Sequence, residues 1–259
     1  MTSHQPIVLV DGREATRDEL VAFALVNDGH FTAMQVRGGA VRGLDLHFGR
    51  LEDAHRTLYG TGLDLPRLRA LMRAAVSEHP DAYLRVTVAE HEPGRPVVMT
   101  VVRPPVEPGT EPVALLPVDW SRAVPEVKHV GSFAQIHYWR LAERAGYDDA
   151  LLIDPAGRIN ETTIANIAFI GPEGIVWPDG PALHGITRQL LQSAFPSHQR
   201  RAHTAPVTLA DLDRFSSAVL VNSIGVAPVG RIGDHRFRDS TAAAQELDAL
   251  YREVPEEGI

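Results

Sequence analysis

The chain contains a single lysine, Lys128, beside 24 arginines. A guanidinium stays protonated in proteins, whereas a lysine amine can act as a nucleophile, form a Schiff base or serve as a general base. Where codon bias replaces lysine by arginine, a lysine is retained where its amine is needed. Lys128 lies in the segment 125–131, on a loop between a predicted strand and a predicted helix, a common place for catalytic groups. We therefore expect Lys128 to be catalytic, the alternative being a surface lysine without a role.

Three further segments carry residues suited to bind a ligand. Glu161 lies in a polar stretch between a turn and a strand. Gly185 and Thr187 stand where a helix is expected to begin, and the backbone N–H groups and hydroxyl of such a start suit a phosphate. The polar turn at 222–225 follows a strand and offers further N–H donors. Each segment alone is also compatible with a solvated glutamate or an ordinary capped helix.

The N-terminal part predicts an α+β domain over residues 1–105. Thr16 to Glu19 form a capping box for a helix reaching 26. Short strands within 36–46 are joined at the turn 38–39, and helices are expected from His47 and near Pro66. A strand pair, 82–89 and 97–102, completes this smaller domain.

The C-terminal part predicts a larger α/β domain over residues 113–259 that carries the lysine. The proline- and glycine-rich stretch after the first domain is typical of a linker, which we assign to 106–112. Beyond it we expect helices at 132–145 and from Thr187, and strands at 113–118, 150–153, 167–170 and 218–221. The expected fold is a two-domain α/β fold of the α+β type.

The segments around Lys128, Glu161, Gly185 and Ser223, in this order, resemble the fold-type IV pyridoxal-phosphate enzymes, the class IV aminotransferases. That family includes branched-chain and D-amino acid aminotransferases and aminodeoxychorismate lyase. The resemblance spans 29–229, and its most specific part is Glu161…Asn166-Ile167 followed by Gly185-Ile186-Thr187-Arg188. It implies pyridoxal 5'-phosphate as cofactor. It also implies that Lys128 forms the internal aldimine and moves a proton during the reaction.

The resemblance also implies the residues that hold the cofactor. Glu161 would pair with the pyridine nitrogen and keep it protonated, so that the ring accepts electrons. Arg50, in the pattern His47-x-x-Arg50-Leu51, would grip the phosphate in a bidentate manner. The implied cofactor-binding set is Arg50, Lys128, Glu161, Asn166, Ile186, Thr187, Ser223 and Ile224.

The substrate residues depart from the family pattern. Branched-chain members place a tyrosine five residues after the lysine, where this chain has Phe133. Gln35 stands where many members carry an arginine, and we expect Arg37 on the other face of the strand. The Lys128-His129 pair and Gln135 look closer to the lyase branch. The candidate substrate residues are Phe31, Gln35, Arg37 and Phe133.

These features favour an enzyme that transfers an amino group between an amino acid and a 2-oxo acid. A lyase similar to aminodeoxychorismate lyase, which releases pyruvate, is the first alternative. A non-catalytic relative that binds the cofactor is the second, and a cofactor-free Schiff-base enzyme is a remote third. The family implies a homodimer.

Composition excludes other classes. The 25 basic and 33 acidic residues give a net charge of −8, which disfavours nucleic acid and anionic membranes as partners. The chain has no cysteine, so disulfides and thiolate metal sites are excluded. None of the histidines shows the spacing of a metal site, and we expect no metal. No apolar run reaches the ~20 residues of a membrane span, and the N-terminus shows no leader pattern. We expect a cytoplasmic protein with small-molecule substrates.

Overall fold

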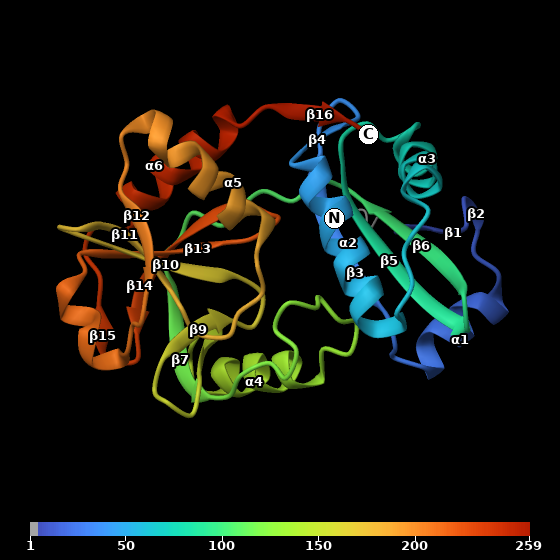
Figure 1. The fold of residues 1–259 in the computed structure, drawn as a ribbon. Coiled ribbons are helices and arrows are strands. Elements are labelled where there is room, and N and C mark those ends of the chain that lie inside the picture. The colour runs from blue at the N-terminus through green and yellow to red at the C-terminus, as the bar shows by residue number, and fades with distance from the viewer. Residues whose placement is uncertain (1–4) are drawn as a thin grey trace. The chain divides into compact units, whose positions relative to one another are not determined.

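The computed structural model describes residues 5–259 (Figure 1). Residues 1–4, which begin the predicted N-terminal domain and the N-terminal stretch without a leader pattern, lie outside the described residues. The chain divides into two compact units. The first runs to Val106 and also contains Val127–Gly131 and Pro255–Ile259, and the second contains Glu107–Glu126 and Ser132–Val254. Mixed helices and strands in both units confirm the predicted fold class.

The first unit is built on an antiparallel five-stranded sheet of order β2-β1-β6-β5-β3. Leu51 of α2 and Met72 of α3 belong to the same buried cluster as Met34, Leu84 and Val86 of the sheet. Side chains alternate across a strand, so these helices cover one face of the sheet. The elements are β1 (Ile7–Val10), β2 (Arg13–Glu14), α1 (Arg17–Leu25), β3 (His30–Val36), β4 (Ala40–Arg42), α2 (Leu44–Tyr59), α3 (Leu65–Val76), β5 (Ala82–Glu92) and β6 (Arg95–Arg103).

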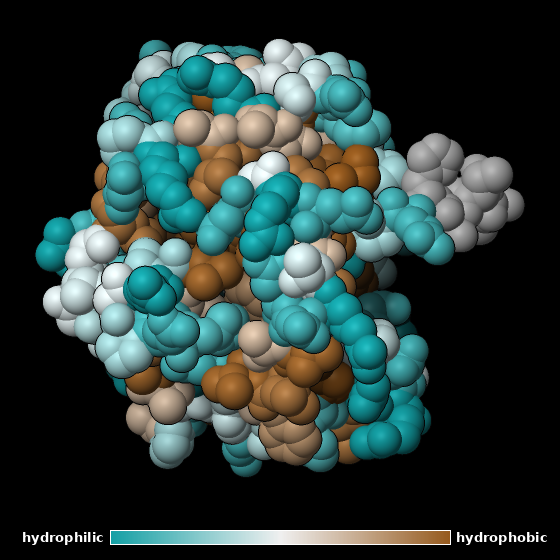
Figure 2. Space-filling model, turned by 90° about the vertical axis from the view of Figure 1, so that its right-hand side faces the viewer, coloured by the Kyte–Doolittle hydropathy of each residue, from teal (hydrophilic) through white to brown (hydrophobic). Residues whose placement is uncertain are grey.

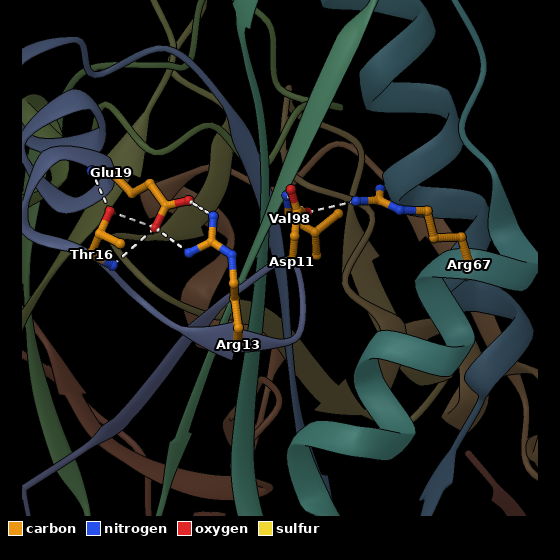
Figure 3. A network of polar contacts seen from close by, with 6 residues as sticks. All are labelled: Asp11, Arg13, Thr16, Glu19, Arg67 and Val98. Carbon is orange, nitrogen blue, oxygen red and sulfur yellow. Dashed lines mark hydrogen bonds and ion pairs between the residues drawn. The ribbon is translucent and has the colours of Figure 1, made fainter.

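Local chemistry explains several helix ends of this unit. The predicted capping box is confirmed: Thr16 and Glu19 exchange backbone and side-chain hydrogen bonds at the start of α1. Arg13 also contacts the Glu19 carboxylate (Figure 3). These bonds, that from Arg13 first, lower the pKa of Glu19 to about 2. In the same view Asp11 accepts hydrogen bonds from Arg67 and from the Val98 backbone.

The structure corrects two boundaries. Helix α2 begins at Leu44 and not at His47, after Gly43 in the left-handed region at φ 68°. A glycine adopts this conformation without strain, so the chain turns directly from β4 into the helix. Strand β3 begins at His30, six residues before the predicted strand, because it pairs with β5 along its whole length.

The end of the chain belongs to the first unit. Strand β16 (Glu256–Gly258) pairs with β4 (Figure 1), and Ile259 joins the hydrophobic core. The carbonyl of Ile259 accepts a hydrogen bond from Arg73 at 2.7 Å.

The second unit is built on a nine-stranded sheet of order β12-β11-β10-β13-β14-β7-β8-β9, with β15 paired to β14. Its strands are β7 (Val113–Asp119), β8 (Asp149–Ile153), β9 (Ile159–Thr162), β10 (Asn166–Gly171), β11 (Gly174–Pro178), β12 (Ala202–Ala205), β13 (Ser217–Val221), β14 (Val226–Ile232) and β15 (His235–Arg236). The helices are α4 (Phe133–Arg144), α5 (Ile186–Ala194) and α6 (Ser240–Glu253), with 3-10 turns at Phe195–His198 and Leu209–Arg214.

Both faces of this sheet are buried. Ala168 and Val219 pack with α5 and α6, whereas their neighbours Phe169 and Leu220 belong to a second cluster. Near-continuous apolar strands such as β8 are expected when both faces are covered. The predicted strands at 113–118, 150–153, 167–170 and 218–221 are confirmed within a residue or two.

The segment that carries Lys128 belongs to the first compact unit. The domain boundaries predicted from the sequence assign this segment to the C-terminal domain instead. His30 and His129 form an isolated antiparallel bridge. The backbone N–H of Phe31 donates to the carbonyl of Lys128, and that of Val130 donates to Gly29, both at 2.9 Å. These pairings attach the lysine segment to the edge of β3, and no local pattern indicates them.

Over residues 5–259, no helix combines the length and apolar character needed to cross a membrane. The space-filling view shows brown, hydrophobic patches within a largely hydrophilic face (Figure 2). Helix α1 buries none of its residues and exposes Leu20, Val21 and Leu25.

Buried histidines predict acid sensitivity of the first unit. Burial lowers the pKa of His47, and also of His30, from 6.5 to about 3. The unfolded chain binds these protons near pH 6.5 and the folded chain does not, so stability falls as the pH drops below 6.5. Between pH 7 and pH 4, His47 alone is expected to remove about 3 kcal/mol from the free energy of unfolding.

The measurement is urea unfolding as a function of pH. The variant His47→Gln should lose less stability on acidification than the wild type. His203 is exposed, so His203→Gln is the matched control and should keep the wild-type pH dependence. Equal pH dependence in His47→Gln and the wild type would contradict the assignment.

Candidate active site

The side chain of Glu161 is 3% exposed in the second unit. One carboxylate oxygen, Oε1, accepts the Nε–H of Arg122. The other, Oε2, accepts the backbone N–H of Leu183 at 3.2 Å and the side-chain amide of Asn166 at 3.5 Å. A buried carboxylate requires such partners because desolvation of the charge is costly. The side chain therefore presents a fixed acceptor at the end of β9.

Asn166 connects this carboxylate to the start of helix α5. Its amide donates to the carbonyl of Leu183 at 2.8 Å, and its oxygen accepts the N–H of Gly185 at 3.1 Å. A Cβ at position 185 would overlap the Asn166 oxygen, so the position requires glycine. The predicted site residues Glu161 and Asn166 are thus brought together with the predicted helix start.

The N-terminus of α5 suits an anion. Among the described residues, no side chain caps it with a hydrogen bond. The first-turn N–H groups of a helix, here those of Ile186 and Thr187, have no partner inside the helix. Together with the helix dipole they favour a negative charge. The hydroxyl of Thr187 donates to the carbonyl of Asn222 at 2.7 Å, which connects α5 to the turn that carries Ser223.

The turn 222–225 supports this site less directly than the sequence implied. The N–H of Ile224 already donates to the side-chain oxygen of Asn222 at 2.8 Å. The Asn222 side chain therefore satisfies the N–H that the resemblance assigned to the phosphate.

In the first unit, Lys128 lies beside Phe31. Its ammonium Nζ is 5.0 Å from the centre of the Phe31 ring, and the Arg85 guanidinium is 3.6 Å from the same centre. Burial lowers the pKa of Arg85, with Arg103 adding to the effect and Tyr83 opposing it. Cations stack on aromatic faces, so Phe31 positions two basic groups close to each other.

Arg50 lies on α2 of the first unit, three residues after His47. Burial lowers its pKa from 12.5 to about 10, and the Arg50 charge in turn contributes to the low pKa of His47. The His47 ring contacts the Thr32 hydroxyl at 2.6 Å. A desolvated guanidinium that stays protonated at neutral pH suits an anionic ligand such as a phosphate.

The expectation for Arg37 is wrong. Its guanidinium donates to the side-chain oxygen of Gln35 at 3.2 Å, so the two side chains lie on the same side. Residues two apart in an extended chain share a face, which is the physical reason. The Gln35 amide donates to the carbonyl of Val106. Phe133, in the second unit, begins α4, is 81% exposed and stacks on His137 at 5.9 Å.

Two arginines are absent from the candidates derived from the sequence. Arg85 shares one face of β5 with Tyr83 and Thr87. Polar residues at every second position of a strand are a signal from which this face could have been predicted. Arg122 precedes Lys128 by six residues in a loop, where nothing in the local sequence distinguishes it from the other arginines.

Replacing Gly185 by alanine tests the connection between Glu161 and α5. The added Cβ overlaps the Asn166 oxygen, and the hydrogen bond to the residue-185 N–H would be lost. We expect Gly185→Ala to lower the free energy of unfolding by about 1–3 kcal/mol.

The measurement is urea unfolding at neutral pH. A methyl group added at Gly109, in the same unit, would point into open space, so Gly109→Ala is the control and should change stability by less than about 0.5 kcal/mol. If both variants match the wild type, the close packing of Gly185 against Asn166 is refuted.

Comparison with known proteins gives consistent results. A Rickettsia bellii protein named a probable branched-chain-amino-acid aminotransferase is 29% identical over 137 residues, which span 46% of this chain and 47% of that protein. The matched stretch thus covers about half of that relative. A Methanocaldococcus jannaschii protein named a putative branched-chain-amino-acid aminotransferase is 28% identical over 229 residues, 78% of this chain and 77% of that protein.

Solved structures share the fold. A hypothetical aminotransferase from Mycobacterium tuberculosis in its PLP-bound form has a TM-score of 0.82 at 20% identity, covering 96% of this chain and 98% of that one. The 4-amino-4-deoxychorismate lyase from Pseudomonas aeruginosa has a TM-score of 0.78 at 23% identity, covering 95% and 99%. The sequence model of the family Amino-transferase class IV matches residues 29–232. The chain therefore belongs to the class IV aminotransferase family.

Proposed function

We propose that this protein is a pyridoxal-phosphate-dependent aminotransferase that transfers an amino group between an amino acid and a 2-oxo acid. The observation that carries the proposal is the buried Glu161 carboxylate in a chain of this family whose only lysine is Lys128. The relatives named as branched-chain aminotransferases favour transfer over other outcomes.

The residues present fit the cofactor. The fixed carboxylate of Glu161 suits the protonated ring nitrogen, and the uncapped start of α5 suits the phosphate. We assign the buried guanidinium of Arg50 to the same phosphate, as a cationic group in addition to the N–H groups of α5. We propose Arg50, Lys128, Glu161, Asn166, Ile186, Thr187 and Ser223 as the cofactor-binding residues. Ile224 belongs to the same turn as Ser223, but its N–H already donates to Asn222.

When bound, pyridoxal 5'-phosphate supplies an aldehyde that reacts with amines and a protonated ring that takes up an electron pair. The amine of Lys128 would hold the cofactor aldehyde and would carry a proton as general base and acid. Glu161 would hold the proton at the ring nitrogen. Asn166 fixes the carboxylate relative to α5, so these groups need no rearrangement during the reaction.

Substrate binding is assigned to the face of β3 and β5 that carries Phe31. Arg85 stacks on Phe31 beside Lys128 and can form two hydrogen bonds with a carboxylate. We propose Arg85 as the group that binds the substrate carboxylate, with Gln35 and Arg37 as neighbours on the same side. Phe133 carries no hydroxyl and cannot donate a hydrogen bond to the cofactor.

A lyase similar to aminodeoxychorismate lyase is the second candidate. The phenyl ring at Phe133, five residues after the lysine, departs from the tyrosine of branched-chain members, and the Lys128-His129 pair favours the lyase branch. The His129 ring accepts the N–H of Gly131 at 2.9 Å and pairs with Asp28 at 3.4 Å. A polar side chain with fixed partners therefore follows the lysine in the chain.

The function is tested by adding pyridoxal 5'-phosphate to the purified protein, reducing with borohydride and mapping peptides by mass. We expect an absorption band of the bound cofactor and one reduced adduct, on Lys128. The variant Lys128→Ala should give no adduct, whereas Arg252→Leu, an exposed position on α6, should behave as the wild type. An unmodified Lys128 at saturating cofactor would refute the proposal.

A half-reaction distinguishes the two candidate activities. With an amino acid alone, a transaminase leaves the cofactor in its amine form and releases one equivalent of 2-oxo acid. A lyase releases pyruvate over many turnovers with the cofactor spectrum unchanged. We expect the first result with branched-chain amino acids, and repeated pyruvate release from an amino-dienyl ether would support the lyase instead.

We also propose a homodimer. Helix α1 buries no residue in the single chain, and Leu25 is 78% exposed, which is typical of a surface that a partner covers. Light scattering should give twice the chain mass of 28.3 kDa, and a monomer mass would contradict the proposal.

A further inference from the structure

Arg122 contacts Glu161 from the loop that leads to Lys128. The Arg122 side chain is 11% exposed and that of Glu161 is 3% exposed. The other ion pairs of arginine in this unit include Arg252 with Asp248 and Arg158 with Asp154, whose arginine side chains are 63% and 39% exposed. The Arg122–Glu161 pair is therefore shielded from water far more than these two.

The partners of Glu161 differ in charge. Leu183 and Asn166 donate neutral hydrogen bonds, whereas Arg122 supplies a full positive charge in direct contact. Arg188 on α5 is a second cation that interacts with Glu161. Burial lowers the pKa of Arg188, and the nearby charge of Glu161 opposes that lowering. Its guanidinium stacks on Trp177 at 5.1 Å. In a buried setting, removing a paired counter-charge leaves a costly uncompensated ion.

The acceptor sites of the carboxylate are nearly filled. An ionised carboxylate offers about four lone-pair sites. Arg122, Leu183 and Asn166 occupy three of them. With donors counted over residues 5–259, one site thus remains for a single additional N–H donor, which is what a protonated ring nitrogen provides.

We propose that Arg122 is a positioning residue that compensates the buried Glu161 carboxylate and leaves one of its acceptor sites for the ring nitrogen of pyridoxal 5'-phosphate. This inference rests on the proposed function. Without the guanidinium, the buried carboxylate loses its charged partner and the contact that fixes its orientation toward the ring nitrogen.

The test is the dissociation constant of pyridoxal 5'-phosphate, measured by absorbance titration at pH 7 on the full chain. At pH 7, Arg122→Leu should weaken binding by about tenfold or more. Arg122→Lys restores a positive charge and should show a smaller loss, and Glu161→Gln should also bind weakly.

Arg252→Leu is the matched control. It removes the same side chain from an exposed ion pair of the same unit and should keep wild-type affinity. Thermal unfolding of the cofactor-free proteins gives a second readout. Arg122→Leu should be less stable than the double variant Arg122→Leu/Glu161→Gln, because the double variant contains no unpaired buried charge.

Two outcomes overturn the proposal in distinguishable ways. If the wild type binds the cofactor and Arg122→Leu matches it in affinity while Glu161→Gln is impaired, only the role of Arg122 falls. If the wild type itself forms no adduct on Lys128, the proposed function falls and the inference falls with it. Should Arg122→Leu not fold, Arg122→Lys decides: weaker binding than in the wild type is expected, and binding equal to the wild type while Glu161→Gln is impaired overturns the proposal.

Discussion

A buried negative charge is the main constraint on the second unit. The Glu161 side chain is almost fully removed from water, and an isolated ion in that position would cost several kcal/mol. The chain compensates it with donors from separate segments: Arg122 from the loop after β7, Leu183 from the loop before α5, and Asn166 at the start of β10. These segments must converge for the charge to be tolerated, so the carboxylate determines the local course of the backbone.

The same constraint explains the geometry of helix α5. Asn166 uses its amide for Glu161 and Leu183, and its oxygen for the N–H of Gly185. The glycine is needed there because a side chain would enter the space of the Asn166 oxygen. The first turn of α5 is thereby placed at a fixed position relative to a carboxylate and keeps its N–H groups for an anion. An acceptor for a cationic nitrogen and a donor set for a phosphate are thus connected by one amide side chain.

Sequence patterns predicted the features that depend on near neighbours. The capping box at Thr16, the proline at the start of α3 and the strand pair 82–89 and 97–102 follow from local chemistry, and each is confirmed. The motif around Glu161 and Gly185 also identified residues that hydrogen bonds connect in the structure. Side-chain type and spacing suffice when the partners belong to one short motif.

Features that depend on distant partners were missed. The pairing of the Lys128 segment with β3, and that of β16 with β4, join residues about 100 and 200 positions apart. Arg122 is one arginine among 24, and only the fold shows that it meets Glu161. The face of Arg37 was predictable in principle, because residues two apart on a strand lie on the same side, and the hydrogen bond to Gln35 shows that they do.

We propose that Glu161, the start of α5 and Lys128 bind one cofactor. A crystal structure of the protein with pyridoxal 5'-phosphate tests this most directly. We predict the ring nitrogen within about 3 Å of a Glu161 oxygen, the phosphate at the N–H groups of Ile186 and Thr187, and a covalent bond to the amine of Lys128. A ring nitrogen facing another group, with Glu161 bonded only to Arg122, Asn166 and Leu183, would contradict it.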